Sequence, residues 1–296
     1  MRVVVSGGSG FLGRPLCRAL RASGHSVIVL TRRGREKGDL AWSPDFPTGA
    51  WVAAVQAADV VINLAGEGIA DKRWSVARKT AILQSRVTAT RALAATLRDA
   101  VRPAVFLSGS AIGIYGNGGA DTLTEDTTAG TDFLARVCVE WEREATAVSD
   151  ITRVVLLRTG VVLARDGGAL PRMALPFRLF AGGAIGSGQQ FMSWIHRDDW
   201  IAMTMWAIGA PVSGPMNLTA PAPVTNATFA RTLGRVLHRP SVLPVPAFAL
   251  RLALGELADT ALLSSQRVVP HAALGGGFEF RYPELEGALR AIYGPM

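Results

Sequence analysis

Apolar residues in the first half of the chain fall into short runs that alternate with amphipathic segments. Five runs have the length and composition of buried strands: residues 2–6, 26–31, 60–64, 104–108 and 153–157. Between them, three longer segments repeat apolar residues at helical spacing: 14–23, 79–97 and 131–147. Strands that alternate with helices predict a parallel sheet covered on both faces, an α/β fold of the Rossmann-type, doubly wound class.

The regular alternation ends after about residue 163. Glycines then interrupt short apolar pieces, and prolines concentrate between Pro211 and Pro246. We therefore expect a first domain over residues 1–165 and a smaller C-terminal α/β lobe over residues 166–296. This lobe would pack over the carboxyl edge of the sheet, where ligands of such folds bind, and some of its segments would return to the main sheet.

The first strand runs into a glycine-rich turn, Gly7-Gly8-Ser9-Gly10-Phe11-Leu12-Gly13, which opens the first helix. Gly7 permits the tight turn, Gly10 lets the backbone approach a pyrophosphate, and Gly13 lets the helix pack against the strand. At this place in the chain the motif predicts a dinucleotide-binding domain. Without its strand and helix it would indicate only a turn.

The end of the second strand bears on the choice between NAD and NADP. A carboxylate there accepts hydrogen bonds from the ribose 2′-hydroxyl of NAD, but this chain has Thr31-Arg32-Arg33. Guanidinium groups clamp a 2′-phosphate. The residues therefore favour NADP, with a solvated arginine pair in a loop as the alternative.

Small residues follow two further predicted strands. Asn63-Leu64-Ala65-Gly66 is typical of a loop that runs close beneath a cofactor, and residues 108–116 read SGSAIGIYG. A serine in the second loop can hydrogen-bond a substrate hydroxyl or carbonyl.

Together these motifs resemble the extended short-chain dehydrogenases/reductases, the group that includes nucleotide-sugar epimerases and dehydratases. Three later stretches also match that group: residues 158–161, 194–199 and 217–219. A second set of motifs is similar to a narrower group, an atypical, NAD(P)-dependent epimerase-family branch of unassigned substrate that has a distinctive C-terminal region. These motifs are Glu67 and residues 85–86, 141–142, 167–170 and 186–188.

The resemblance implies a set of cofactor contacts. The residues implied are Gly7, Gly10, Phe11 and Gly13 at the pyrophosphate, Thr31 and Arg32 at the 2′-phosphate, Leu64 and Ala65 at the ribose near nicotinamide, and Arg86 and Val161. Val161 would present its backbone to the nicotinamide amide. Arg86 stands where typical members have an asparagine, so its charge could reach the phosphates; the alternative is an exposed helix cation.

The catalytic pair of the family is missing. Typical members carry Tyr-x-x-x-Lys on the helix after the serine loop, and the matching segment here has Leu134 and Cys138 at those positions. No shifted alignment restores the pair, because Lys79 is the last lysine and Tyr115 has a glycine four residues on. Ser110 and Tyr115 remain the candidate catalytic residues. The alternatives are that Ser110 only stabilises a turn and that Tyr115 only shapes the pocket.

Other polar side chains have structural interpretations. His196, Asp198 and Asp199 invite a triad or metal site, but at a junction between strand and helix we expect Asp198 or Asp199 to cap the helix. We expect Glu140 and Glu142 on the charged face of a helix.

Composition narrows the classes of function further. The net charge is +8, but the arginines are scattered and the densest basic run, residues 32–37, has no interleaved aromatics, so we expect no nucleic-acid partner. Cys17 and Cys138 lie in apolar stretches without metal spacing, which predicts buried free thiols and no metal. With neither a signal peptide nor a membrane-spanning run, the expected location is cytoplasmic, away from membranes.

The sequence therefore predicts an NADP(H)-binding oxidoreductase or epimerase-like enzyme whose small substrate is a carbonyl compound or a sugar nucleotide. Its missing Tyr-x-x-x-Lys pair supports an alternative, a non-catalytic NADP(H)-binding sensor or regulatory module.

Overall fold

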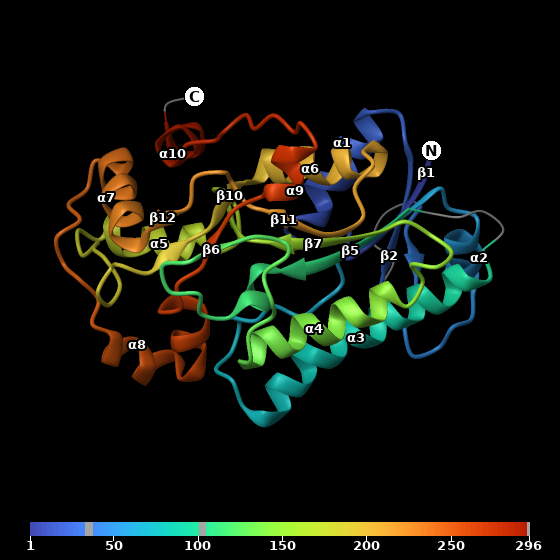
Figure 1. Ribbon diagram of the computed structural model, residues 1–296, viewed down its shortest axis with the longest axis horizontal. Helices are drawn as coiled ribbons and strands as arrows, with labels where there is room; N and C mark the ends of the chain where they lie inside the picture. Colours follow the sequence, from blue (N-terminus) through green and yellow to red (C-terminus); the bar gives the residue numbers. More distant parts are fainter. Residues whose placement is uncertain (33–37, 101–104, 295–296) are drawn as a thin grey trace.

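The computed structural model describes residues 1–32, 38–100 and 105–294. In this part of the chain the main sheet has seven parallel strands in the order β11-β7-β5-β4-β1-β2-β3 (Figure 1). They are β1 Arg2–Ser6, β2 Ser26–Thr31, β3 Leu40–Ala41, β4 Val60–Asn63, β5 Val105–Ala111, β7 Val154–Thr159 and β11 Gly214–Leu218. The doubly wound parallel fold predicted from the apolar pattern is confirmed.

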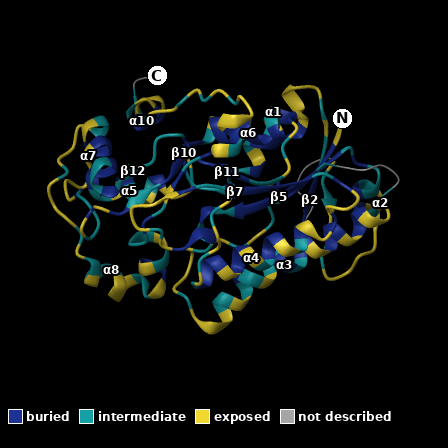
Figure 2. Ribbon diagram, in the orientation of Figure 1, coloured by how far each residue is buried: buried dark blue, intermediate teal, exposed yellow. Residues whose placement is uncertain are grey.

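Helices cover both faces of this sheet (Figure 1). Helices α1 (Gly13–Ala22) and α6 (Arg197–Gly209) lie on one face, and α2 (Ala50–Gln56), α3 (Val76–Arg98) and α4 (Phe133–Thr146) lie on the other. The helix sides that face the sheet are buried (Figure 2), with Leu16 and Trp200 in one core and Trp51 and Leu93 in the other. Burial of these apolar side chains holds the three layers together.

Capping side chains set where two of the helices begin. The Ser75 hydroxyl accepts the N–H of Arg78 at 3.2 Å, so α3 starts at Val76, three residues before the predicted start. Asp132 accepts the N–H of Ala135 at 2.9 Å, so α4 starts at Phe133, two residues after the predicted start. Both caps satisfy helix N–H groups that would otherwise lack partners.

The later part of the chain builds a second core beside the carboxyl ends of the strands. Helices α5 (Leu170–Arg178), α7 (Asn226–Leu237) and α10 (Leu285–Tyr293) pack around Phe177, Phe229 and Leu289. The remaining elements are the strands β6 Thr122–Leu123, β8 Val161–Leu163, β9 Phe191–Met192, β10 Trp194–His196, β12 Val224–Thr225 and β13 Arg267–Val268, the helices α8 Ala247–Leu254 and α9 His271–Gly275, and the single turns η1 Ile112–Tyr115 and η2 Ala258–Leu262.

Strand β11 comes from this later part but pairs with β7 in the main sheet. The division of the chain at residue 165 stays a prediction. Among the described residues, none of the helices combines the length and the apolar character that crossing a bilayer requires.

Candidate functional site

The glycine turn after β1 is a tight loop that only glycine fits at two positions. Gly7 has φ +72°, and a Cβ there would stand 2.5 Å from the Leu64 carbonyl oxygen. A Cβ on Gly13 would stand 2.2 Å from the Gly7 carbonyl oxygen. Among the described residues no side chain caps α1, and its first turn holds no acidic residue, so the positive end of this helix can attract an anion.

A buried hydrogen-bond network fixes the loop beneath this turn. The Ser6 hydroxyl donates to Asn63 Oδ1 at 2.7 Å, and the Ala65 N–H donates to the same oxygen at 3.2 Å. Asn63 Nδ2 in turn donates to the Thr90 hydroxyl of α3 at 2.8 Å. This network holds Leu64 and Ala65, the two residues predicted to contact the ribose near nicotinamide, against Gly7.

Phe11, predicted at the pyrophosphate, packs against two glycines from a later segment of the chain, Gly167 and Gly168. A Cβ on Gly167 would lie 2.5 Å from the Phe11 ring, and one on Gly168 would lie 2.9 Å from it. The Arg197 guanidinium lies 5.8 Å from the ring centroid. Phe11 thus joins the glycine turn to residues 167–168 and to Arg197 of α6, and its contact with a pyrophosphate stays a prediction.

The residues predicted to select NADP lie at the end of β2. Thr31 is buried and Arg32 is exposed, while Arg33 lies outside the described residues. Because β2 pairs with β1, Arg32 shares the carboxyl edge of the sheet with the glycine turn.

Ser110, at the end of β5, belongs to a buried polar network. Its hydroxyl donates to Glu142 Oε1 at 2.6 Å. Arg158 of β7 donates to both oxygens of the same carboxylate, from Nε and Nη2, at 2.9 Å each. The expectation that Glu142 lies on a charged helix face is therefore wrong; it faces the sheet, whereas Glu140 pairs at the surface with Arg143.

Tyr115 joins the same network from the other side of Arg158. Its hydroxyl donates to Asn217 Oδ1 at 2.7 Å and accepts from Arg158 Nη1 at 2.9 Å. Burial raises the pKa of Tyr115, and the Arg158 charge only partly opposes this effect. The structure thus brings Ser110 and Tyr115 together through Glu142 and Arg158, two residues that were not predicted as site residues.

The positions of the missing pair are apolar and buried. Leu134 and Cys138 both lie on the inner face of α4. Desolvation raises the pKa of Cys138 to about 12, so its thiol is neutral at physiological pH. Cys17 is buried as well, and within the described residues neither cysteine forms a disulfide, which confirms the prediction of buried cysteines outside any disulfide.

Arg86 of α3 lies between the loop after β4 and helix α4. It donates from Nη1 to the Ile82 carbonyl and from Nη2 to the Glu67 carbonyl, at 2.9 Å each. Its guanidinium lies 5.1 Å from the ring centroid of Trp141. Val161, by contrast, already donates its N–H to the Ser193 carbonyl at 2.9 Å, and its contact with nicotinamide stays a prediction.

The expectation that Asp198 or Asp199 caps α6 is wrong. The cap is His196, whose Nδ1 accepts the N–H of Asp198 at 3.1 Å. Asp199 instead accepts the N–H groups of Arg281 and Tyr282, at 3.0 and 2.9 Å, and so ties the C-terminal segment to α6. No group of three or more metal-type side chains occurs within the described ranges.

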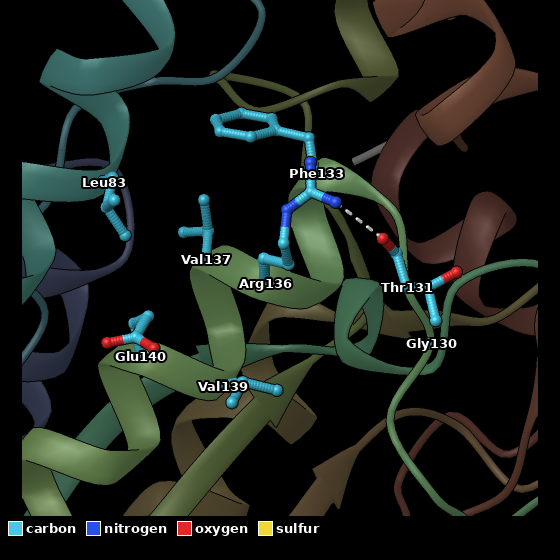
Figure 3. Close-up of a pocket in the computed structure, with 8 residues that line it drawn as sticks. All are labelled: Leu83, Gly130, Thr131, Phe133, Arg136, Val137, Val139 and Glu140. Carbon is cyan, nitrogen blue, oxygen red and sulfur yellow. Dashed lines mark hydrogen bonds between the residues drawn. The ribbon is translucent and has the colours of Figure 1, made fainter.

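A pocket of about 570 Å³ lies between α3 and the first turns of α4 (Figure 3). Leu83, Phe133, Val137 and Val139 give it an apolar wall, and Arg136 lies in it. None of the predicted site residues lines this pocket.

Comparison with known proteins assigns the chain to a family. Residues 3–219 match the profile of the NAD dependent epimerase/dehydratase family. The chain belongs to this family. Residues 245–292 of this family member also match a domain of unknown function, DUF1731. The resemblance seen in the motifs, including the distinctive C-terminal region, is therefore confirmed.

Three related proteins are informative. The crystal structure of the human epimerase family protein SDR39U1 (isoform 2) with NADPH superposes with a TM-score of 0.91, at 34% identity and over 100% of both chains. An Arabidopsis thaliana protein, the chloroplastic SDR39U1 homolog, is 43% identical over 302 residues, which are 99% of this chain and 86% of that protein. A nucleoside-diphosphate sugar epimerase from Corynebacterium glutamicum has a TM-score of 0.82 at 35% identity, over 99% of this chain and 58% of that chain.

These comparisons bear on two further expectations. The predicted cofactor, NADP, agrees with the NADPH in the human structure. The cytoplasmic location stays a prediction, because the Arabidopsis relative is described as chloroplastic.

Proposed function

We propose that this family member binds NADPH and uses it in oxidoreductase or epimerase-like chemistry on a small carbonyl compound or sugar nucleotide. The observation that carries the proposal is the glycine turn, packed on Leu64 and Ala65 beneath an uncapped α1. Its shape suits a pyrophosphate, and the human relative in complex with NADPH supports the same cofactor.

Arg32 is the proposed contact for the 2′-phosphate. It is exposed at the end of β2, at the edge of the sheet that carries the glycine turn. A guanidinium at this place attracts the 2′-phosphate of NADPH, and NADH offers it only a neutral hydroxyl.

Ser110 is the proposed catalytic residue, and Tyr115 is proposed to position the network behind it. The bound cofactor supplies or accepts hydride. In the oxidising direction a substrate hydroxyl would pass its proton to Ser110 Oγ while Ser110 passes its own proton to Glu142, 2.6 Å away. The reverse movement would protonate a substrate carbonyl oxygen during reduction. Tyr115 would hold Arg158 against Glu142 and so keep that carboxylate in place.

One observation favours a second candidate, a non-catalytic NADP(H)-binding module. Leu134 and the neutral Cys138 thiol replace the tyrosine and lysine that typical relatives use, and neither can act as an acid or base near pH 7. Such a module would bind the cofactor tightly and leave it unchanged.

Turnover assays separate the two candidates. The absorbance of NADPH would be followed with a panel of carbonyl compounds, and epimer formation with a panel of sugar nucleotides. We expect at least one substrate to react, and Ser110→Ala to lower its rate by about 10²-fold or more. Ser23→Ala, an exposed serine at the end of α1, is the control. Tight NADPH binding without any product over broad panels would favour the binding module.

A further inference from the structure

An exposed apolar patch covers helix α8 and two segments beside it. Its six large apolar side chains, which we call the α8 patch, are each more than half exposed: Leu179, Phe180, Val242, Leu243, Phe248 and Leu252. Among the helices of the described residues, α8 alone holds no buried residue. It lies at the outer edge of the molecule (Figures 1 and 2). An apolar surface of this kind marks a site of contact with another molecule or with a membrane.

The side chains of the patch form one surface because the segments that carry them lie side by side. Main-chain hydrogen bonds of 3.0 and 2.8 Å join residues 182–184 to residues 243–245, and two parallel β-bridges run between the same segments. Helix α8 begins two residues later, at Ala247. Phe248 and Leu252, four residues apart, share one face of this helix.

The two stretches of chain around the patch hold cations and no carboxylates. Residues 167–190 and 238–255 contain four arginines and neither aspartate nor glutamate. In the described part of the chain, Arg178 and Arg239 are exposed and neither is paired with a carboxylate. The Arg239 guanidinium lies 4.6 Å from the ring centroid of Phe180. The patch is therefore an apolar surface with a positive rim.

Two features argue against a protein as the occupant of the patch. Pro240, Pro244 and Pro246 have no N–H, and the N–H groups of residues 243 and 245 already bind inward, so this edge offers few donors to an added strand. A symmetric contact between two copies of the chain would bring the same arginines together, and facing like charges repel.

An anionic bilayer complements both properties of the patch. Apolar side chains on a surface helix enter the boundary between headgroups and acyl chains, and neighbouring arginines bind the lipid phosphates. We infer that the α8 patch binds the surface of an anionic membrane, with Phe248 and Leu252 among the acyl chains and Arg178 and Arg239 at the phosphates. The expectation of no membrane partner rests on the lack of a spanning run and a signal peptide, and surface binding requires neither.

Sedimentation of the full chain with lipid vesicles tests this inference. The vesicles consist of phosphatidylcholine, with or without phosphatidylglycerol. Phe248→Ser tests insertion, and Phe46→Ser is its matched control, because the two phenylalanines are 71% and 70% exposed. Arg239→Gln tests the charge, with Arg18→Gln, an exposed arginine of α1, as its control. Circular dichroism checks that each variant folds.

We expect the unchanged protein to bind the vesicles that contain phosphatidylglycerol and to bind pure phosphatidylcholine much more weakly. Phe248→Ser should weaken binding by about 10-fold or more, the loss of one inserted ring. Arg239→Gln should weaken it by about fivefold, and added salt should have the same direction of effect. Neither Phe46→Ser nor Arg18→Gln should change it.

Four results would overturn the inference. The unchanged protein could fail to sediment with anionic vesicles, or it could bind both kinds of vesicle equally. Losses as large in Phe46→Ser as in Phe248→Ser would show that the net positive charge of the protein adsorbs to lipid without the patch. A dimer in analytical ultracentrifugation that Phe248→Ser dissociates, without vesicle binding, would make the patch an interface between two copies of the chain.

Discussion

Replacing Glu142 with glutamine perturbs the buried network behind Ser110. The carboxylate accepts a hydrogen bond from Ser110 at 2.6 Å and two from Arg158 at 2.9 Å. Glutamine has nearly the same shape but no charge, and one of its two oxygen positions becomes an N–H₂ donor. Arg158, itself buried, would therefore remain charged without an anion.

The size of the effect follows from this geometry. Breaking one side of a buried ion pair costs about 3–5 kcal/mol. The entropy of unfolding, roughly 2.1 cal/mol/K per residue, amounts to about 0.6 kcal/mol per degree for 296 residues. Glu142→Gln should therefore lower Tm by about 5–8 °C.

Thermal unfolding followed by circular dichroism measures this shift. Glu140→Gln is the control, because the exposed pair of Glu140 with Arg143 should contribute less than about 1 kcal/mol. The double variant Glu142→Leu with Arg158→Met removes both charges and should lose less stability than Glu142→Gln. A Glu142→Gln protein that melts within about 1 °C of the unchanged chain would refute the argument from the buried ion pair.

Three further outcomes are expected. Gly13→Ala should abolish NADPH binding in a fluorescence titration, because its Cβ would stand 2.2 Å from the Gly7 carbonyl oxygen. The control Gly287→Ala should bind NADPH normally, because its Cβ would meet no atom of the described residues within 4 Å. Similar NADPH affinities of the two variants would speak against the turn as the cofactor site. Cys138 should react with a thiol reagent only after unfolding, because burial raises its pKa to about 12, and rapid labelling of the folded protein would contradict this. Burial lowers the pKa of His196, so as the pH falls below about 6.5 the unfolded chain binds a proton on this histidine before the folded protein does, and stability is lost. His196→Asn keeps a side-chain cap on α6 and should make the free energy of unfolding, measured with denaturant, less dependent on pH in this range. An unchanged pH dependence in this variant would contradict the prediction.

The strands and the glycine turn could be predicted because their signals are local. A buried parallel strand is a continuous apolar run, and the turn needs glycine where a Cβ would meet backbone, as at Gly7 and Gly13. The starts of α3 and α4 were displaced by two or three residues, because the hydroxyl of Ser75 and the carboxylate of Asp132 decide them and not the apolar pattern.

The centre of the polar network could not be predicted in the same way. Glu142 and Arg158 lie on different elements, and their pairing depends on how α4 sits against β7. Charged residues on a helix are usually solvated, so the pattern alone put Glu142 on the outer face. The surroundings of Arg86 likewise come from the loop after β4 and from α4, which only the fold brings together.

Titration of the protein with NADPH and with NADH tests most directly whether the glycine turn and the end of β2 form an NADP site. NADPH should bind more tightly than NADH. Arg32→Ala should weaken NADPH binding by about 1–3 kcal/mol, the worth of a charge-assisted contact, and leave NADH binding nearly unchanged. Equal affinities for the two cofactors, or equal losses in Arg32→Ala, would contradict the assignment.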